Sequence, residues 1–219
     1  MAAYVARPND SAKHPGIMIF QEAFGVNPYI RDVADRFAKE GFTAIAPELF
    51  HRTVQGFEGS YTDFASTQEH TTKLTNEGLE ADVVATHEWL SNDAQTDPQK
   101  TFSIGFCMGG RVSFFADSIV PLKASVSFYG GGIAQGLLDR AKNLHGPILL
   151  FWGGLDKNIL PEHTRAIEDA LRAAGKEYGS VTFSYANHGF FCDQRAAYNE
   201  KASKQAWPMT LEFLKYHLK

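Results

Sequence analysis

The stretch FSIGFCMGGRVSFFA, Phe102 to Ala116, places one cysteine between glycines at the end of an apolar run. The run is typical of a buried β-strand, and the residues from Gly109 onward are typical of the start of a helix. Two interpretations of Cys107 are open. Free cysteine is among the most buried residue types, so Cys107 could be a small core residue. Flanked by glycines at a strand-to-helix bend, it could instead be a nucleophile held in a cleft.

Short apolar runs alternate with longer amphipathic segments along the rest of the chain. The apolar runs predict six strands, at residues 16–20, 42–46, 101–106, 124–129, 147–152 and 181–185. Apolar residues at helical spacing predict helices at residues 27–40, 79–90, 109–116, 161–174 and 201–218. This alternation predicts an α/β fold with a mostly parallel sheet and helices on both faces. We expect residues 1–219 to form one domain.

One connection differs from the others in length and polarity. Residues 50–75 are polar, contain Gly56 and Gly59, and join a strand to a helix by a long excursion. Long connections in compact domains tend to be functional or mobile. Whether this segment acts as a lid stays open at this point.

Composition restricts the class of partner. The chain has 219 residues, of which 44% are hydrophobic and 21% charged, and its net charge is −4. This profile is typical of a soluble globular protein, and the negative balance argues against nucleic acid or an anionic membrane as the main partner. Residues 1–16 lack the apolar core of a signal peptide, and two cysteines are too few for a disulfide framework. We expect a cytoplasmic protein, either a monomer or a small homo-oligomer.

Side chains that carry chemistry follow the ends of several predicted strands. Ligands of an open parallel sheet bind at the carboxyl ends of its strands. Cys107, Asp156 and His188 each come directly after a strand, so we expect a thiol, a carboxylate and an imidazole at one edge of the sheet. The chain order of nucleophile, acid and histidine is that of the α/β-hydrolases. Asp156 could instead cap a turn, and His188 beside Gly189 could be a turn or surface residue.

The cysteine turn has a form that nucleophilic chemistry requires. Gly105-Phe106-Cys107-Met108-Gly109 matches the G-x-nucleophile-x-G pattern, in which small flanking residues let strand and helix pass closely. The backbone N–H of Met108, at the helix start, can face a developing oxyanion. The helix N-terminus also favours a thiolate over a thiol.

These residues carry a resemblance to the dienelactone hydrolase family of α/β-hydrolases. The matching stretches span nearly the whole chain: HPGIMIFQEAFGVN (14–27), GFTAIAPELF (41–50), SIGFCMGG (103–110), SFYGGG (127–132), FWGGLDKNI (151–159) and ANHGFF (186–191). The resemblance implies an α/β-hydrolase fold. It also implies that Cys107 is the nucleophile, Asp156 the orienting acid and His188 the general base.

The resemblance further implies an oxyanion hole formed by the backbone N–H groups of Ala23 and Met108, with Glu22 beside the nucleophile. A carboxylate next to a thiol disfavours the thiolate. In the resembling family this residue is thought to keep the resting cysteine protonated and turned aside until substrate arrives, which protects it from oxidation. The alternative is a Glu22 that forms an ion pair with a nearby Arg52 or Arg111.

The substrate is less clear than the chemistry. No metal or organic cofactor is required, because the sequence has no HExxH, GxxxxGK or GxGxxG pattern. Dienelactone hydrolases bind a carboxylated lactone through two arginines, and this sequence has Cys192 at one of those positions and no arginine in residues 66–73. Arg52 and Arg195 are candidate replacements. Aromatic residues near strand ends could line an apolar pocket or belong to the core: Phe24, Tyr61, Phe64, Tyr129, Phe190 and Phe191.

The sequence thus favours a cysteine-dependent hydrolase of small esters or lactones that acts through a thioester. The substrate-binding residues expected are Phe24, Arg52, Tyr129 and Phe190. A thioesterase or acyl transferase on the same fold is one alternative. A non-catalytic binding protein that kept the fold is another.

Overall fold

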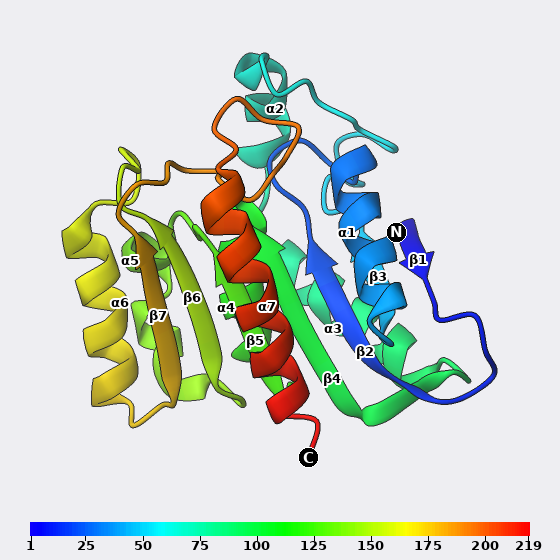
Figure 1. Ribbon diagram of the computed structural model, residues 1–219. Coiled ribbons are helices and arrows are strands. Elements are labelled where there is room, and N and C mark those ends of the chain that lie inside the picture. Colours follow the sequence, from blue (N-terminus) through cyan, green and yellow to red (C-terminus); the bar gives the residue numbers. More distant parts are fainter.

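The computed structural model describes all residues, Met1–Lys219, and contains one seven-stranded sheet with the order β1-β3-β2-β4-β5-β6-β7 (Figure 1). Its strands are β1 (Ala3–Ala6), β2 (His14–Phe20), β3 (Thr43–Pro47), β4 (Thr96–Phe106), β5 (Ala124–Phe128), β6 (Ile148–Gly153) and β7 (Tyr178–Phe183). Only β1 runs antiparallel to its neighbour, and the other pairs are parallel. The predicted α/β fold with a mostly parallel sheet is confirmed.

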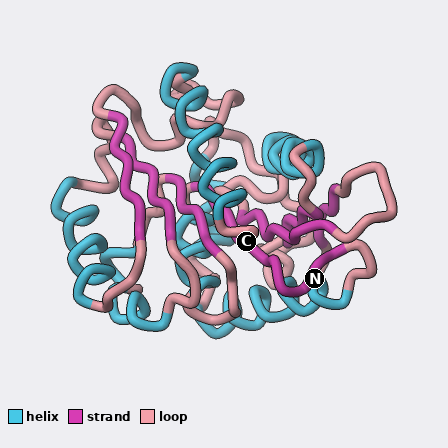
Figure 2. Tube along the Cα trace, turned by 60° about the horizontal axis from the view of Figure 1, so that its bottom comes forward, coloured by secondary structure: helices cyan, strands magenta, loops and turns pink.

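Helices cover both faces of the sheet, with α1 and α7 in front of it and α3 and α4 behind it in Figure 1; Figure 2 shows the same layers from another side. The helices are α1 (Pro28–Lys39), α2 (Phe64–Thr71), α3 (Asn76–Asn92), α4 (Met108–Asp117), α5 (Ile133–Gly136), α6 (Pro161–Ala173) and α7 (Glu200–Tyr216), with a 3₁₀ turn, η1 (Leu138–Asn143). None of these helices is both long and apolar enough to cross a bilayer.

The helix boundaries follow from capping chemistry that the sequence displays. The Asn27 side chain accepts a hydrogen bond from the Ile30 N–H at the start of α1, where Pro28 occupies the first turn. Gly175 follows the C-cap residue of α6 and has a φ of 65°. Helix α3 contains the helix predicted over residues 79–90, and its Leu79, Val83, Thr86 and Leu90 are all buried.

Four short elements were not predicted: β1, α2, α5 and the 3₁₀ turn η1. Strand β1 has only four residues and pairs through one edge, so its apolar run is too brief to stand out. Helix α2 lies within residues 50–75, and the sequence hid it because it buries a single side chain, Thr67. Strand β7 also lies earlier than the predicted 181–185, ending at Phe183.

A buried carboxylate holds the far end of α4, the helix that follows Cys107. Asp117 accepts hydrogen bonds from Ser125 Oγ at 2.6 Å and from the N–H groups of His145 and Gly146 at 3.1 and 2.9 Å. Burial raises the pKa of Asp117 to about 7, although these donors favour the ionised form. The protonated acid is therefore held more firmly in the folded state than in the unfolded state.

This pKa shift predicts a pH-dependent stability. Because the pKa of Asp117 is higher in the folded state, the protonated acid contributes to the free energy of unfolding. This contribution is at most about 4 kcal/mol; it is fully present below the unfolded pKa of about 4 and is lost as pH rises to about 7. We expect Asp117→Asn, which stays neutral, to gain in melting temperature relative to the unmodified protein between pH 5 and pH 8. Asp139→Asn, on the 3₁₀ turn η1, is the control. If the difference in melting temperature between Asp117→Asn and the unmodified protein did not change with pH, the raised pKa of Asp117 would be contradicted.

Candidate active site

Cys107 occupies a strained bend between β4 and α4. Its φ of 56° and ψ of −117° lie where a residue with a side chain is disfavoured, at a cost of about 1–3 kcal/mol. Backbone hydrogen bonds hold the bend in place, because the Cys107 N–H donates to Phe128 O at 3.0 Å and its carbonyl accepts from Gly110 N at 3.0 Å. The side chain is half-buried, so a small molecule can reach the sulfur.

The two glycines around this bend are sterically required. A Cβ on Gly105 would lie 1.8 Å from Gly109 O, and a Cβ on Gly109 would lie 2.1 Å from Phe20 O. Strand β4, helix α4 and the end of β2 therefore approach one another as closely as their backbones allow. The sequence pattern around Cys107 thus reflects a real spatial constraint.

Asp156 and His188, which are 32 residues apart, meet at the same edge of the sheet. His188 Nδ1 lies 2.7 Å from Asp156 Oδ2. The other oxygen, Oδ1, accepts from the N–H groups of Asn158 and Ile159 at 2.7 and 3.1 Å. Asp156 therefore caps a turn and also binds the imidazole. Burial opposes its ionisation, but these hydrogen bonds outweigh burial and lower the pKa of Asp156.

The imidazole of His188 is coupled to Cys107 as well as to Asp156. Burial alone would lower its pKa, but the negative charge of a Cys107 thiolate and the hydrogen bond with Asp156 raise the pKa of His188 to about 10. Both neighbours therefore favour the charged imidazolium. The neutral imidazole can take a proton from the sulfur, and the imidazolium can deliver one to a leaving group.

Glu22 is buried, with 1% of its surface exposed, and is paired with Arg195. Arg195 Nη1 donates to Glu22 Oε1 at 2.9 Å, whereas Oε2 has no protein partner. Burial raises the pKa of Glu22 more than the Arg195 charge lowers it. The expectation that an ion pair at Glu22 would use Arg52 or Arg111 is wrong, because Arg111 instead contacts Asn76 Oδ1 at 3.0 Å.

Arg195 is enclosed by aromatic rings. Its guanidinium carbon lies 5.6 Å from the ring centroid of Phe24, 5.9 Å from that of Tyr61 and 6.0 Å from that of Phe64. Gly189, with a φ of 79°, gives it room, since a Cβ there would lie 2.4 Å from Arg195 Nη1. The arginine therefore joins the α2 region to the loop that carries His188.

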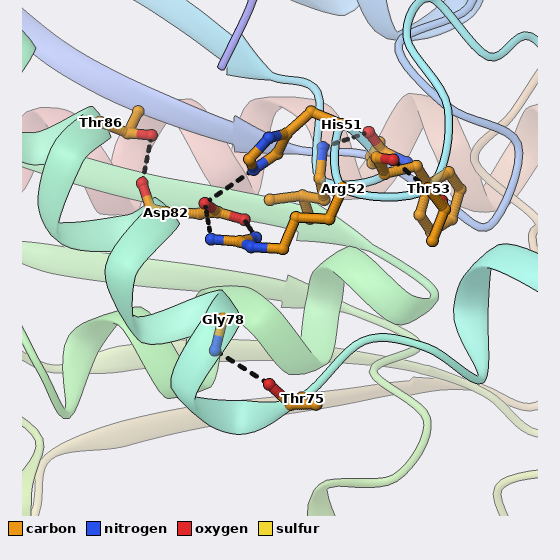
Figure 3. Close-up of polar contacts among 10 residues, drawn as sticks. His51, Arg52, Thr53, Thr75, Gly78, Asp82 and Thr86 are labelled. Atoms are coloured by element: carbon orange, nitrogen blue, oxygen red, sulfur yellow. Dashed lines mark hydrogen bonds and ion pairs between the residues drawn. The ribbon is translucent and has the colours of Figure 1, made fainter.

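Arg52 has a different partner from the one expected. Its guanidinium binds Asp82 of α3 with both nitrogens, at 2.6 and 2.8 Å, and His51 reaches the same carboxylate at 3.0 Å (Figure 3). It borders a hollow of about 120 Å³ whose lining includes Thr75 and Gly78 but not Cys107. The guanidinium of Arg52 thus holds residues 51–53 against α3 and does not make the substrate contact that the sequence predicted.

The other predicted residues differ in exposure. Phe24, Tyr129 and Phe190 are fully buried, so their side chains belong to the packed interior. The Tyr129 ring is centred 5.0 Å from that of His188. Phe64, by contrast, is 55% exposed at the rim.

Two backbone donors are available near the sulfur. Met108 is the first residue of α4, and helix geometry leaves its N–H without an intrahelical acceptor. Ala23 follows Glu22 in a turn, and its N–H donates to no protein group. Both residues are half-buried like Cys107. No three His, Cys, Asp or Glu side chains are grouped as a metal centre would require.

Comparison with known proteins gives matches along nearly the whole chain. The sequence model described as "Dienelactone hydrolase family" matches residues 1–218. A "Putative carboxymethylenebutenolidase" of Synechocystis sp. is 36% identical over 100% of this chain and 93% of the relative, and one of Escherichia coli K12 is 34% identical over 99% and 83%. A crystal structure titled "Putative Dienelactone Hydrolase", from Klebsiella pneumoniae, has a TM-score of 0.89 and 33% identity, and the match covers 97% of this chain and 92% of that one.

The steric constraint at the bend predicts a sharp contrast between two glycines. Gly105→Ala would place a methyl group against Gly109 O, which we expect to lower the free energy of unfolding by on the order of several kcal/mol. The melting temperature should then fall by more than about 10 °C, or the variant should not fold at all. Gly136→Ala, in α5, is the matched control, since nothing lies within 4 Å of its added Cβ. Equal melting temperatures for the two variants would contradict the close approach of β4 and α4.

Proposed function

Because the chain belongs to the dienelactone hydrolase family, we propose that it hydrolyses small carboxylic esters or lactones with Cys107 as its nucleophile. The observation that carries this proposal is the strained bend at Cys107, with the His188–Asp156 pair coupled to its sulfur. Strain of this kind persists where surrounding structure enforces it, and it clusters at active sites.

In the first half of the reaction, the Cys107 thiolate attacks the carbonyl carbon, a C–S bond forms, and the carbonyl electron pair moves to oxygen. The N–H groups of Ala23 and Met108 donate to this oxyanion. When the intermediate collapses, the C–O bond to the leaving group breaks and the His188 imidazolium protonates the departing alkoxide. The products of this half are an alcohol, or the ring-opened hydroxyl of a lactone, and a thioester on Cys107.

In the second half, the now neutral His188 accepts a proton from water as the water oxygen attacks the thioester carbonyl. The C–S bond breaks, the carboxylic acid leaves, and its proton is lost to solvent. Cys107 and the protonated His188 are restored as thiolate and imidazolium. Asp156 holds Nδ1 throughout, which keeps Nε2 directed at the reacting atoms.

Glu22 has a protective role in this proposal. Its negative charge beside the sulfur disfavours the thiolate while the site is empty, and Arg195 offsets part of that charge. A substrate that separates the sulfur from Glu22 removes this repulsion. The nucleophile is then most reactive when the substrate is bound, which limits oxidation between turnovers.

Arg195 is our candidate for recognising an acidic substrate. A guanidinium has five N–H donors, and Glu22 occupies one of them. Both terminal nitrogens of Arg52 already donate to Asp82. Arg195 is therefore our candidate, because it has N–H donors that are free to bind a substrate carboxylate. The proposed substrates are therefore esters or lactones that bear a carboxylate.

The nucleophile assignment is tested by substitution. We expect Cys107→Ala and His188→Ala each to lower kcat/KM for p-nitrophenyl acetate by at least about 10³-fold, because the residues act as one unit. Cys107→Ser should retain little activity, since a hydroxyl needs stronger base assistance than a thiol. His217→Ala is the control, because His217 caps the C-terminal end of α7. That end of α7 lies away from the loop that joins β7 to α7 (Figure 1). Wild-type rates in Cys107→Ala would refute the proposal.

The substrate assignment needs a pair of esters that differ only in charge. Arg195→Ala should lower kcat/KM for a carboxylate-bearing ester about 10- to 100-fold more than for its methyl-capped analogue, the range expected for a charge-assisted hydrogen bond. Arg165→Ala, on the exposed side of α6, controls for the loss of a positive charge elsewhere. If Arg195→Ala slows both esters equally, the arginine does not select for the carboxylate.

A further inference from the structure

Four buried side-chain polar atoms have no partner within the protein. Three of them are Glu22 Oε2, Tyr29 Oη and Tyr129 Oη, and the fourth is Ser127 Oγ of β5. Both tyrosines are completely inaccessible, and Glu22 is almost so. A buried polar group left unbonded costs about 1–3 kcal/mol, and more if charged, so folded proteins rarely leave even one such group unpaired.

The three groups come from different elements, and their charges act on one another. Glu22 follows β2, Tyr29 lies in the first turn of α1, and Tyr129 follows β5. Burial raises the pKa of each tyrosine far above its ordinary value, and the Glu22 carboxylate adds to the effect on both. Tyr129 also contributes to the raised pKa of Tyr29. Both phenols are therefore protonated hydrogen-bond donors within the field of the Glu22 carboxylate.

The backbone at Tyr129 adds an independent indication. Its φ of 40° is in the left-handed region, which a bulky aromatic residue rarely adopts. Cys107 is the one other non-glycine residue with a positive φ in the chain. Strain at a buried aromatic residue whose ring lies against His188 indicates that the position of this side chain is functionally constrained.

We propose that Tyr29 and Tyr129 are positioning residues for Glu22, and that their hydroxyls donate to one shared buried water that donates in turn to Glu22 Oε2. Two donors and one acceptor require a ligand with two lone pairs and a hydrogen, which a water molecule provides. A buried water typically makes about three such bonds. This inference rests on the proposed function in one respect, the role of Glu22 beside a nucleophilic Cys107.

The consequence concerns how the Glu22 carboxylate is held. Arg195 holds Oε1, and the two tyrosines hold Oε2 through the water. The carboxylate then keeps its place and its charge when a substrate competes for Arg195. The other charged or titratable groups that act on Glu22 are His188 and Cys192, both on the loop after β7.

Alkylation of Cys107 tests this without any substrate. In Tyr29→Phe, Tyr129→Phe and the double variant, loss of the donors destabilises the ionised Glu22, so its carboxyl is neutral over a wider pH range. Repulsion of the thiolate falls, and we expect iodoacetamide to label Cys107 about three- to tenfold faster at pH 6–7 than in the unmodified protein. Mass spectrometry of the two cysteine peptides separates Cys107 from buried Cys192.

Two comparisons separate this role from a loss of packing. In a Glu22→Gln background the tyrosine substitutions should no longer change the labelling rate, because no charge is left to hold. Tyr4→Phe, which removes a hydroxyl bonded to Asp35 at 2.9 Å, is the control. An unchanged labelling rate in the double variant, or an equal acceleration in the Glu22→Gln background, would overturn the proposal.

A crystal structure gives a direct second test. We expect an ordered water within hydrogen-bond distance of Tyr29 Oη, Tyr129 Oη and Glu22 Oε2, and its loss in the double variant. Hydroxyls bonded to other groups, with no water between them, would refute the proposal even if Cys107→Ala is inactive. Conversely, an active Cys107→Ala with accelerated labelling in the tyrosine variants would refute the nucleophile assignment alone.

Discussion

The close approach of three backbones around Cys107 is the constraint on which the rest of the site depends. Gly105 and Gly109 let β4, α4 and the end of β2 approach one another without space for a side chain. The chain between the two glycines therefore turns at Cys107 with a positive φ, which a cysteine rarely adopts. The bend places the sulfur at the edge of the sheet and leaves the first N–H groups of α4 beside it. A parallel sheet brings Asp156 and His188 to that same edge.

Electrostatics at this edge are balanced among groups that burial would otherwise neutralise. Asp156 stays ionised because it accepts three hydrogen bonds, two from backbone N–H groups and one from the imidazole. Glu22 has weaker support, a single bond from Arg195, and burial moves its pKa upward. Two carboxylates in one site thus differ in what holds them, since Asp156 is hydrogen-bonded on both oxygens and Glu22 pairs directly with the protein on one oxygen alone.

The sequence predicted the features that depend on chain order and local pattern. The sheet class, the main helices, the bend at Cys107 and the strand-end positions of Asp156 and His188 follow from apolar periodicity and from the rule that parallel strands end at one edge. The pairing of Glu22 with Arg195 could not be predicted, because the residues are 173 positions apart and meet only through the path of an irregular loop. Helix α2 escaped prediction because its faces hardly differ in polarity.

The loop of residues 184–199 carries both the imidazole and the guanidinium of the site, and a glycine between them sets their spacing. The roles proposed for these two residues, proton transfer and anion recognition, are therefore encoded in one short, contiguous piece of the gene. Exchanging this piece between relatives would move both properties together, whereas an insertion between His188 and Arg195 would separate them. Diversity in acid selectivity across such proteins can thus arise from changes in loop length, with the sheet and the nucleophile left untouched.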